Sequence, residues 1–243
     1  MQLQKRVSIN VWLHVATMGS FWREVVSELC GEINGSGLYD RATSLHAVVV
    51  GGERWTKTPL TYQRWRVSEA GELWRYEYPT LQQLWKQARD EPEGHYLYLH
   101  TKGVREENSR RYRAMWRRWM SYYLVTRWRD SVAKLDDGFD VVGSLAIGEP
   151  MPHFAGNFWW ARGDYLATLP EPRPVEFGIN ERVWAEMWVC HRQPRPKRFD
   201  WGTPKGSLDA TWELELYRKR DRWGTRAADC EATIANPPAV RAV

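Results

Sequence analysis

The amino-acid sequence predicts one α/β domain built on a mostly parallel β-sheet with helices on both faces. Short apolar stretches typical of buried strands alternate with amphipathic helical patterns along most of the chain, and this order favours a parallel or mixed sheet. The 243 residues are enough for one large α/β domain or two small ones, and they contain no internal repeat. Ligands on such sheets bind beyond the carboxyl ends of the strands, so functional residues are expected there.

The first 52 residues predict a strand, a helix and a second strand. Apolar side chains alternate over residues 7–15, which is the period of a strand. From Phe21 to Ile33 they recur at spacings of three and four, which predicts an amphipathic helix with Ser20 as its N-cap. The Gly35-Ser36-Gly37 segment is expected to end this helix, and the apolar run Leu45–Val50 predicts a buried parallel strand.

The middle of the chain predicts further alternation of strands and helices. Residues 53–71 are polar and are expected to be irregular, and residues 143–152 are expected to form a loop. Between these segments the patterns indicate, in order, a strand over 73–78, a helix over 80–89, a strand over 95–100, a long helix over 107–135 and a strand over 139–142.

The last third predicts smaller elements and a basic extension. An apolar and aromatic segment covers 153–161, followed by a helix over 163–169, a proline-rich break over 170–177 and a helix over 178–189. Residues 191–205 are basic and expected to be extended, 208–222 to be a helix, and 224–243 a frayed tail. We therefore expect a main domain over 1–190 and an extension over 191–243 whose helix packs on it.

Composition narrows the class of protein. Hydrophobic residues make up 43% of the chain and charged residues 27%, which is ordinary for a soluble globular protein. No apolar run approaches the roughly 20 residues that cross a bilayer, and no apolar signal segment is present, which predicts a cytoplasmic protein. The three cysteines are far apart and indicate neither a disulfide framework nor a zinc site. Cys30, on the apolar face of the first helix, is expected to be a buried thiol.

The positive charge of the chain is compatible with a phosphate-bearing partner. The formal net charge is +5 and the isoelectric point is near 9.1, with arginine supplying most of the positive charge. A guanidinium group binds phosphate through two parallel hydrogen bonds, so an arginine-rich surface suits such partners. A GC-rich genome, which favours arginine codons, explains the same composition equally well. Charge alone therefore does not identify a partner.

The first candidate site follows the strand over 95–100. His100, Thr101, Lys102 and Gly103 stand at its carboxyl end, where the sheet is expected to open. Lys102 can supply a cation, His100 can hydrogen-bond or bind a metal, and Gly103 lets another backbone approach closely. A strand that ends in a turn with lysine and glycine is also common without any function.

The second candidate site is the aromatic segment His153–Ala161. Gly156 gives access, Asn157 can bond a hydroxyl, and the face of a tryptophan can stack on the apolar face of a sugar. Trp159 and Trp160 are adjacent, so in a strand their side chains point to opposite faces. At least one of them is therefore expected to be core, and the other is a candidate sugar-binding residue together with His153.

These two segments resemble a family of glycosyltransferases from phages, large DNA viruses and bacteria. The family carries an H-T-K-G turn and a later G-N-F-W-W-A segment, which correspond here to YLYLHTKGV over 96–104 and HFAGNFWWARGDYLATLP over 153–170. The strand with His14 and the segments GSGLYD (35–40), YPTLQQLW (78–85) and NERVWAEMW (180–188) also fit, so the resemblance covers about 7–190.

The resemblance implies a GT-A-like (Rossmann-like) fold and transfer of a sugar, of the hexosyl or N-acetylhexosaminyl type, from a nucleotide sugar such as a UDP-sugar to a hydroxyl. The donor-binding residues would be His14, His100, Thr101, Lys102 and Gly103. The chain departs from the usual pattern because it lacks an Asp-x-Asp triplet. Either cationic side chains neutralise the diphosphate, or His100 and a distant carboxylate hold a divalent metal such as Mn²⁺ or Mg²⁺.

Two carboxylates are candidates for the general base that takes the proton of the acceptor hydroxyl. Glu186 lies among aromatic residues on a predicted helix, where partial desolvation would raise its pKa toward a useful range. Asp140, just before the strand that ends at Gly143, is the second candidate. Each could equally be a surface or capping carboxylate.

Three hypotheses describe the acceptor. Some phage enzymes that resemble this chain are encoded beside TET-like dioxygenases and glycosylate 5-hydroxymethylcytosine in DNA, which would place the protein in the cytoplasm of an infected bacterium. A surface polysaccharide or glycan is the alternative acceptor, and a non-catalytic carbohydrate- or nucleic-acid-binding module is the third hypothesis. For DNA, the expected contacts to the phosphate backbone are made by Arg113, Arg117, Arg118, Arg195, Lys197 and Arg198.

Overall fold

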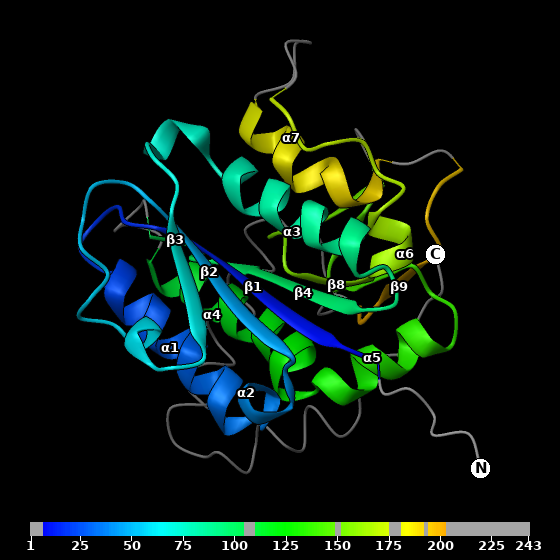
Figure 1. Ribbon diagram of the computed structural model, residues 1–243, viewed down its shortest axis with the longest axis horizontal. Coiled ribbons are helices and arrows are strands. Elements are labelled where there is room, and N and C mark those ends of the chain that lie inside the picture. The colour runs from blue at the N-terminus through cyan, green and yellow to red at the C-terminus, as the bar shows by residue number, and fades with distance from the viewer. Residues whose placement is uncertain (1–6, 105–109, 149–151, 175–180, 192–193, 203–243) are drawn as a thin grey trace.

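The computed structural model confirms the α/β class and describes residues 7–104, 110–148, 152–174, 181–191 and 194–202. A seven-stranded sheet with the order β3-β2-β1-β4-β8-β5-β9 forms its centre (Figure 1). All neighbouring pairs are parallel except those that involve β8, which runs antiparallel to β4 and β5. The strands are β1 (Ile9–Ala16), β2 (Ser44–Val50), β3 (Trp65–Glu69), β4 (His95–His100), β5 (Val141–Gly143), β8 (Trp159–Arg162) and β9 (Arg198–Asp200).

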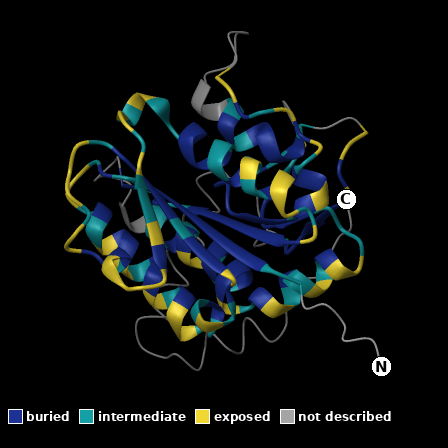
Figure 2. Ribbon diagram, in the orientation of Figure 1, coloured by how far each residue is buried: buried dark blue, intermediate teal, exposed yellow. Residues whose placement is uncertain are grey.

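Helices cover both faces of the sheet, so the central strands are buried on both sides (Figure 2). One face is covered by α1 (Trp22–Gly35), α4 (Arg110–Ser121) and α5 (Trp128–Asp136), and the other by α3 (Tyr78–Asp90), α6 (Gly163–Leu166) and α7 (Glu181–Met187) (Figure 1). The alternation along β1 explains this arrangement, because Val11 and Leu13 enter the core on the α1 face and Trp12 enters the core on the α3 face.

The β1-α1-β2 unit forms as the sequence predicts, with one correction at the start of the helix. Phe21, and not Ser20, is the N-cap of α1, and no side chain caps this end. The helix ends at Gly35, and Gly37 follows with a φ of 74°, which glycine adopts without strain. Gly37 leads into the short helix α2 (Leu38–Arg41).

The segment between β2 and α3 differs from the prediction. The polar stretch expected to be irregular contains the 3₁₀ turn η1 (Pro59–Thr61) and β3, a strand at the edge of the sheet that is only partly buried. An edge strand does not need the continuous apolar run that identifies a central strand. The predicted strand over 73–78 is wrong: Leu73–Arg75 forms the 3₁₀ turn η2, and Tyr76 follows with a φ of 47°.

The long helix expected over 107–135 is interrupted. Between α4 and α5, residues Tyr122–Thr126 form the π-helical segment η3. Wider π turns free backbone carbonyls from the helical ladder, and side chains bond two of them here. The Ser131 hydroxyl lies 3.2 Å from the carbonyl oxygen of Tyr123, and Trp160 Nε1 donates to that of Leu124 at 2.7 Å. The apolar pattern continues through the interruption, so sequence periodicity did not reveal it.

The last third contains more strands than predicted. The expected loop over 143–152 contributes β6 (Ala146–Ile147), which pairs with β7 (His153–Phe154) in a small second sheet. The helix α6 ends at Leu166, earlier than expected, and the 3₁₀ turn η4 (Trp188–Cys190) follows α7 after Met187. The helix predicted over 208–222 and the tail over 224–243 lie outside the described residues. Among the residues that the structure does describe, no helix is long and apolar enough to span a membrane.

Candidate functional site at the carboxyl ends of the parallel strands

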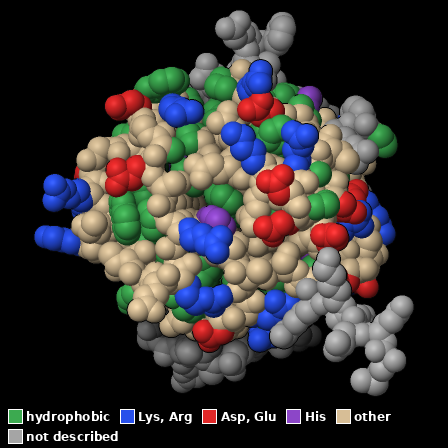
Figure 3. Space-filling model, in the orientation of Figure 1, with side chains coloured by type: hydrophobic (Ala, Val, Ile, Leu, Met, Phe, Trp, Pro, Cys, Tyr) green, Lys and Arg blue, Asp and Glu red, His purple; other side chains and the backbone are tan. Residues whose placement is uncertain are grey.

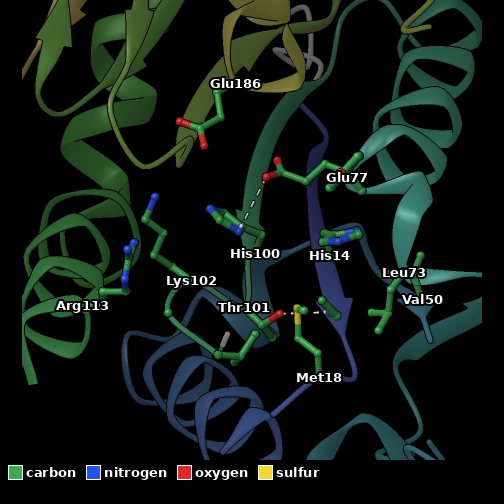
Figure 4. Close-up of a pocket in the computed structure, with 14 residues that line it drawn as sticks. His14, Met18, Val50, Leu73, Glu77, His100, Thr101, Lys102, Arg113 and Glu186 are labelled. Carbon is green, nitrogen blue, oxygen red and sulfur yellow. Dashed lines mark hydrogen bonds and ion pairs between the residues drawn. The ribbon is translucent and has the colours of Figure 1, made fainter. Parts of the chain in front are cut away.

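A pocket opens at the carboxyl ends of β1, β2 and β4, the edge at which an α/β sheet is expected to bind ligands. Near the middle of the face drawn in Figure 3, a basic side chain lies against a histidine. The pocket brings together residues from both halves of the chain (Figure 4), namely His14, Ala16, Met18, Val50, Leu73, Tyr76, Glu77, His100, Thr101, Lys102, Gly103, Val104, Arg113 and Glu186.

One side of the pocket is cationic. Lys102 and Arg113 both line it, and Lys102 Nζ lies 4.4 Å from the centroid of the Trp116 ring. Gly103, with a φ of 88°, makes this packing possible, because a Cβ there would lie 2.6 Å from Cβ of Arg113. The Lys102 carbonyl accepts a hydrogen bond of 2.7 Å from Nη1 of the buried Arg117. The turn that carries Lys102 is thus tied to α4.

On the opposite side, next to Glu77, the His14 side chain is uncharged at neutral pH. His14 is 3% exposed, and its Nδ1 lies 2.8 Å from the Thr80 hydroxyl. Burial lowers the pKa of His14 to about 4, the nearby Glu77 raises it in part, and His100 lowers it further, so the imidazole is neutral near pH 7. Met18, Val50 and Leu73 complete this side.

Thr101 supports the floor of the pocket. Its backbone N–H donates to the His14 carbonyl at 3.0 Å, and its hydroxyl accepts the backbone N–H of Ala16, also at 3.0 Å (Figure 4). These two bonds join the carboxyl ends of β1 and β4. Thr101 is buried and fixes the turn in which Lys102 and Gly103 lie.

Glu77 is a pocket residue that sequence reasoning missed. It immediately precedes α3, is 7% exposed, and lines the pocket. Its Oε2 accepts hydrogen bonds from the Tyr98 hydroxyl at 2.6 Å and from Nδ2 of Asn157. Its Oε1 lies 3.8 Å from His100 Nδ1 (Figure 4). No local motif marks this glutamate in the sequence, because its partners come from β4 and from the turn before β8.

Asn157 and Gly156 contact pocket residues without lining the pocket themselves. The structure does not place either of them among the lining residues, so the prediction that they bind sugar or acceptor directly is not supported. Asn157 is fully buried, with a φ of 54°, and its Oδ1 accepts from Trp159 Nε1 at 2.9 Å. The Gly156 carbonyl lies 2.8 Å from His100 Nε2, so this nitrogen carries the hydrogen. The two candidate segments therefore meet through His100.

The prediction that at least one of the two tryptophans belongs to the core is confirmed, but the assignment of the other to sugar binding is wrong, because both are buried. Trp159 and Trp160 do face opposite sides of the sheet, but each is fully buried in a different hydrophobic cluster. Trp159 stacks on Tyr98, with ring centroids 5.1 Å apart. Neither tryptophan can reach a substrate, and His153, on β7, does not line the pocket either.

The two candidate bases lie at opposite edges of the sheet. Glu186 comes from α7, is half-buried, and lines the pocket (Figure 4). Asp140 directly precedes β5, which runs in the same direction as β4, so it lies at the amino edge. There its carboxylate accepts the backbone N–H of Lys197 at 2.8 Å and lies 3.5 Å from Arg162. Asp140 is therefore wrong as a base for this pocket.

The six expected DNA-binding residues do not form one surface. Arg117 is 4% exposed and pairs with Glu28, and Arg198 is 6% exposed, so neither is available to a phosphate backbone. Arg113 belongs to the pocket, and Arg118 pairs with Glu28 on the surface. The exposed Arg195 and Lys197 precede β9, at the amino edge of the sheet. Only part of the predicted set could contact a ligand at the pocket.

A metal centre is not evident in the described part of the chain. Its residues include no group of three or more histidine, cysteine, aspartate or glutamate side chains that could hold a metal ion. The two described cysteines, Cys30 and Cys190, are buried free thiols, and burial raises the pKa of each to about 12.

Comparison with known proteins identifies the family. Residues 57–203, more than half of the chain, match the model of a domain of unknown function, DUF8361, and the chain belongs to this family. No curated protein matches it. Among solved structures it is similar to two of Rv0371c from Mycobacterium tuberculosis H37Rv, one of them in complex with manganese, at 11% and 12% identity. Each match covers 88% of this chain and 97% of that one, with TM-scores of 0.41 and 0.42.

Proposed function

We propose that this protein is a glycosyltransferase that moves a sugar from a nucleotide-sugar donor, with UDP-sugars as first candidates, to a hydroxyl group. The observation that carries the proposal is the composition of the pocket. Lys102 and Arg113 line it together with the carboxylates of Glu77 and Glu186, at the carboxyl ends of the parallel strands. The resemblance of the H-T-K-G and G-N-F-W-W-A segments to glycosyltransferases supports the same activity.

The pocket residues suit the chemistry of glycosyl transfer. The bond between the anomeric carbon and the diphosphate oxygen breaks, while the acceptor oxygen forms a new bond to that carbon. Lys102 and Arg113 offset the negative charge that develops on the leaving diphosphate. Glu186 takes the proton of the acceptor hydroxyl. The uncharged side formed by His14, Met18 and Leu73 accommodates the less polar part of the donor.

The acceptor proposed first is 5-hydroxymethylcytosine in DNA, on the basis of the family resemblance. A base in duplex DNA must leave the stack to reach a pocket. Of the expected DNA-binding set, Arg113 lines the pocket and the exposed Arg118 lies on the same helix, α4. A surface glycan is the alternative acceptor, and a binding module without activity is the third outcome of the test below.

The test is incubation of the purified protein with a panel of UDP-sugars and three acceptors. The acceptors are an oligonucleotide with 5-hydroxymethylcytosine, the matched cytosine oligonucleotide and a bacterial surface polysaccharide. Mass spectrometry of the acceptors and release of UDP are the readouts. We expect a mass increase of one sugar on the hydroxymethylated oligonucleotide only. Transfer to the polysaccharide would change the acceptor, and a folded protein that releases no UDP under any condition would contradict glycosyl transfer.

Lys102→Ala tests the assignment of the leaving-group charge. We expect turnover to fall about 10²-fold, because the substitution removes a cation next to the diphosphate. The matched control is Lys86→Ala, an exposed lysine on α3 that does not line the pocket, and it should keep the wild-type rate. Equal rates for wild type and Lys102→Ala, with both proteins folded by circular dichroism, would remove Lys102 from the mechanism.

A further inference from the structure

The two oxygens of the Glu77 carboxylate have different surroundings. Oε2 is bonded by the Tyr98 hydroxyl and by Nδ2 of Asn157. Burial, with Glu77 beside it, raises the pKa of Tyr98 well above its usual value, so the phenol keeps its proton and donates. An amide nitrogen can only donate as well. Two donors therefore hold Oε2 and fix the orientation of the carboxylate.

The second oxygen, Oε1, is placed to accept a hydrogen bond from a ligand. Its polar contact in the described part of the chain is His100 Nδ1 at 3.8 Å, which is beyond hydrogen-bond distance. Glu77 lines the pocket, and Figure 4 shows its carboxylate and the His100 ring at the same wall. Oε1 thus keeps acceptor capacity on the side where a ligand would lie.

The two donors on Oε2 hold the Glu77 carboxylate in one orientation, which suits it to accept a hydrogen bond from a ligand through Oε1. Glu186, which comes from a different element and is half-buried, is the better candidate for the base. The two carboxylates of the pocket are thus suited to different tasks.

We propose that Glu77 is the specificity-determining residue that binds a hydroxyl group of the donor sugar through Oε1. This inference rests on the proposed glycosyl transfer and deepens it, because it assigns a role to a residue outside both sequence motifs. Tyr98, Asn157 and, through Asn157, Trp159 are positioning residues that hold the carboxylate. Sites built to bond a hydroxyl discriminate strongly against ligands that lack it, since a buried polar group would be left unpaired.

Glu77→Gln is the substitution that isolates this role. Tyr98 and Asn157 both donate, so they orient the glutamine with its carbonyl oxygen toward them. Its NH₂ group then replaces Oε1 at the pocket wall, which exchanges an acceptor for a donor while the buried network keeps its bonds. The variant is therefore expected to fold, and thermal unfolding checks this.

The experiment measures dissociation constants by calorimetry for UDP, UDP-glucose, UDP-galactose and UDP-N-acetylglucosamine, with wild type and Glu77→Gln. We expect UDP to bind both proteins within about twofold, and the tightest UDP-sugar to lose about 10- to 100-fold on substitution, the size of a charged hydrogen bond. Glu186→Gln is the matched control for loss of a carboxylate charge, and it should lower turnover with little change in sugar affinity.

The outcomes separate the two proposals. If both proteins bind UDP, and the sugar increases the affinity equally in wild type and in Glu77→Gln, the role of Glu77 would be overturned. Glycosyl transfer would still stand. A wild-type protein that binds neither UDP nor any UDP-sugar would overturn the proposed donor, and the role of Glu77 with it. A loss in Glu77→Gln that is equal for UDP and for UDP-sugars would also overturn the inference, because the carboxylate would then act on the nucleotide part.

Discussion

At the scale of single residues, the buried tryptophans of β8 serve the core and the pocket in different ways. Trp160 is fully buried on the α1 face and bonds the carbonyl of Leu124 in the π segment. Trp159 is fully buried on the α3 face and bonds Asn157, which in turn bonds Glu77. Asn157 therefore links Trp159 to the pocket residue Glu77, whereas Trp160 bonds a residue that does not line the pocket.

We predict that Trp159→Ala and Trp160→Ala each lower the free energy of unfolding by about 3–5 kcal/mol, as large truncations in a core do. Trp74→Ala is the control, because the Trp74 side chain is 66% exposed and its loss should change stability by about 0.5 kcal/mol or less. Denaturation with urea measures all three. A tryptophan of β8 whose removal costs no more than that of Trp74 would show that the described packing is wrong.

At the scale of elements, the turn over 101–104 is fixed to two helices by one buried arginine. Arg117, on α4, donates to the Lys102 carbonyl and to Glu28 on α1, and its side chain is 5% exposed. Arg118 binds the same glutamate, but its side chain is 62% exposed. Substitution of Arg117 and of Arg118 therefore compares a buried with an exposed arginine that pair with the same glutamate.

Arg117→Ala removes buried hydrogen bonds to the Lys102 carbonyl and to Glu28, which keeps its exposed partner Arg118. Because a hydrogen bond to a charged group contributes about 1.5–3 kcal/mol, we predict that this substitution lowers the free energy of unfolding by about that amount. Arg118→Ala should cost about 1 kcal/mol or less, since exposed pairs contribute little. Urea denaturation of both variants is the measurement. Comparable losses in the two variants would mean that Arg117 does not anchor the turn.

Elements buried on both faces were the ones that the sequence could predict. β1, β2 and β4 carry continuous or alternating apolar residues, because helices cover both of their sides. The edge strand β3 is only partly buried, so it carries polar residues and lacks the apolar pattern that predicts a strand. The π segment over 122–126 keeps the apolar pattern of its neighbours, and only its tertiary partners distinguish it.

At the scale of the whole molecule, the sequence predicted the part of the candidate site that follows β4 but not the part that comes from α3 and the turn before β8. The topology of an α/β sheet brings the carboxyl ends of its parallel strands to one edge, so a turn after a central parallel strand, such as the one with Lys102, could be placed in advance. Glu77 and Asn157 could not, because they meet only when α3, β4 and the turn before β8 pack together. The same packing shows that Arg117 and Arg198, which read as surface charges, are internal.

Stability in acid is also a property of the whole molecule, because it depends on buried groups whose pKa values are shifted in opposite directions. Burial lowers the pKa of His14 to about 4, whereas burial raises the pKa of Glu32 to about 7. In the unfolded chain the pKa values of these two groups are about 6.5 and 4.3, respectively. Between pH 4.5 and 6.5 the unfolded state therefore binds more protons at His14, and the folded state binds more at Glu32. Acidification in this window weakens the fold through His14 and strengthens it through Glu32.

We predict that His14→Gln reduces the loss of stability between pH 6.5 and 4.5 by about 2 kcal/mol, because a glutamine has no proton to gain in the unfolded chain. Glu32→Gln is the control of opposite sign, since it removes a group that stabilises the folded state on acidification. Between pH 6.5 and 4.5 this variant should therefore lose more unfolding free energy than wild type. Urea denaturation across this pH range measures both. Profiles that shift in the same direction in the two variants would show that His14 is not held neutral by the fold, and the uncharged side of the pocket would have to carry charge.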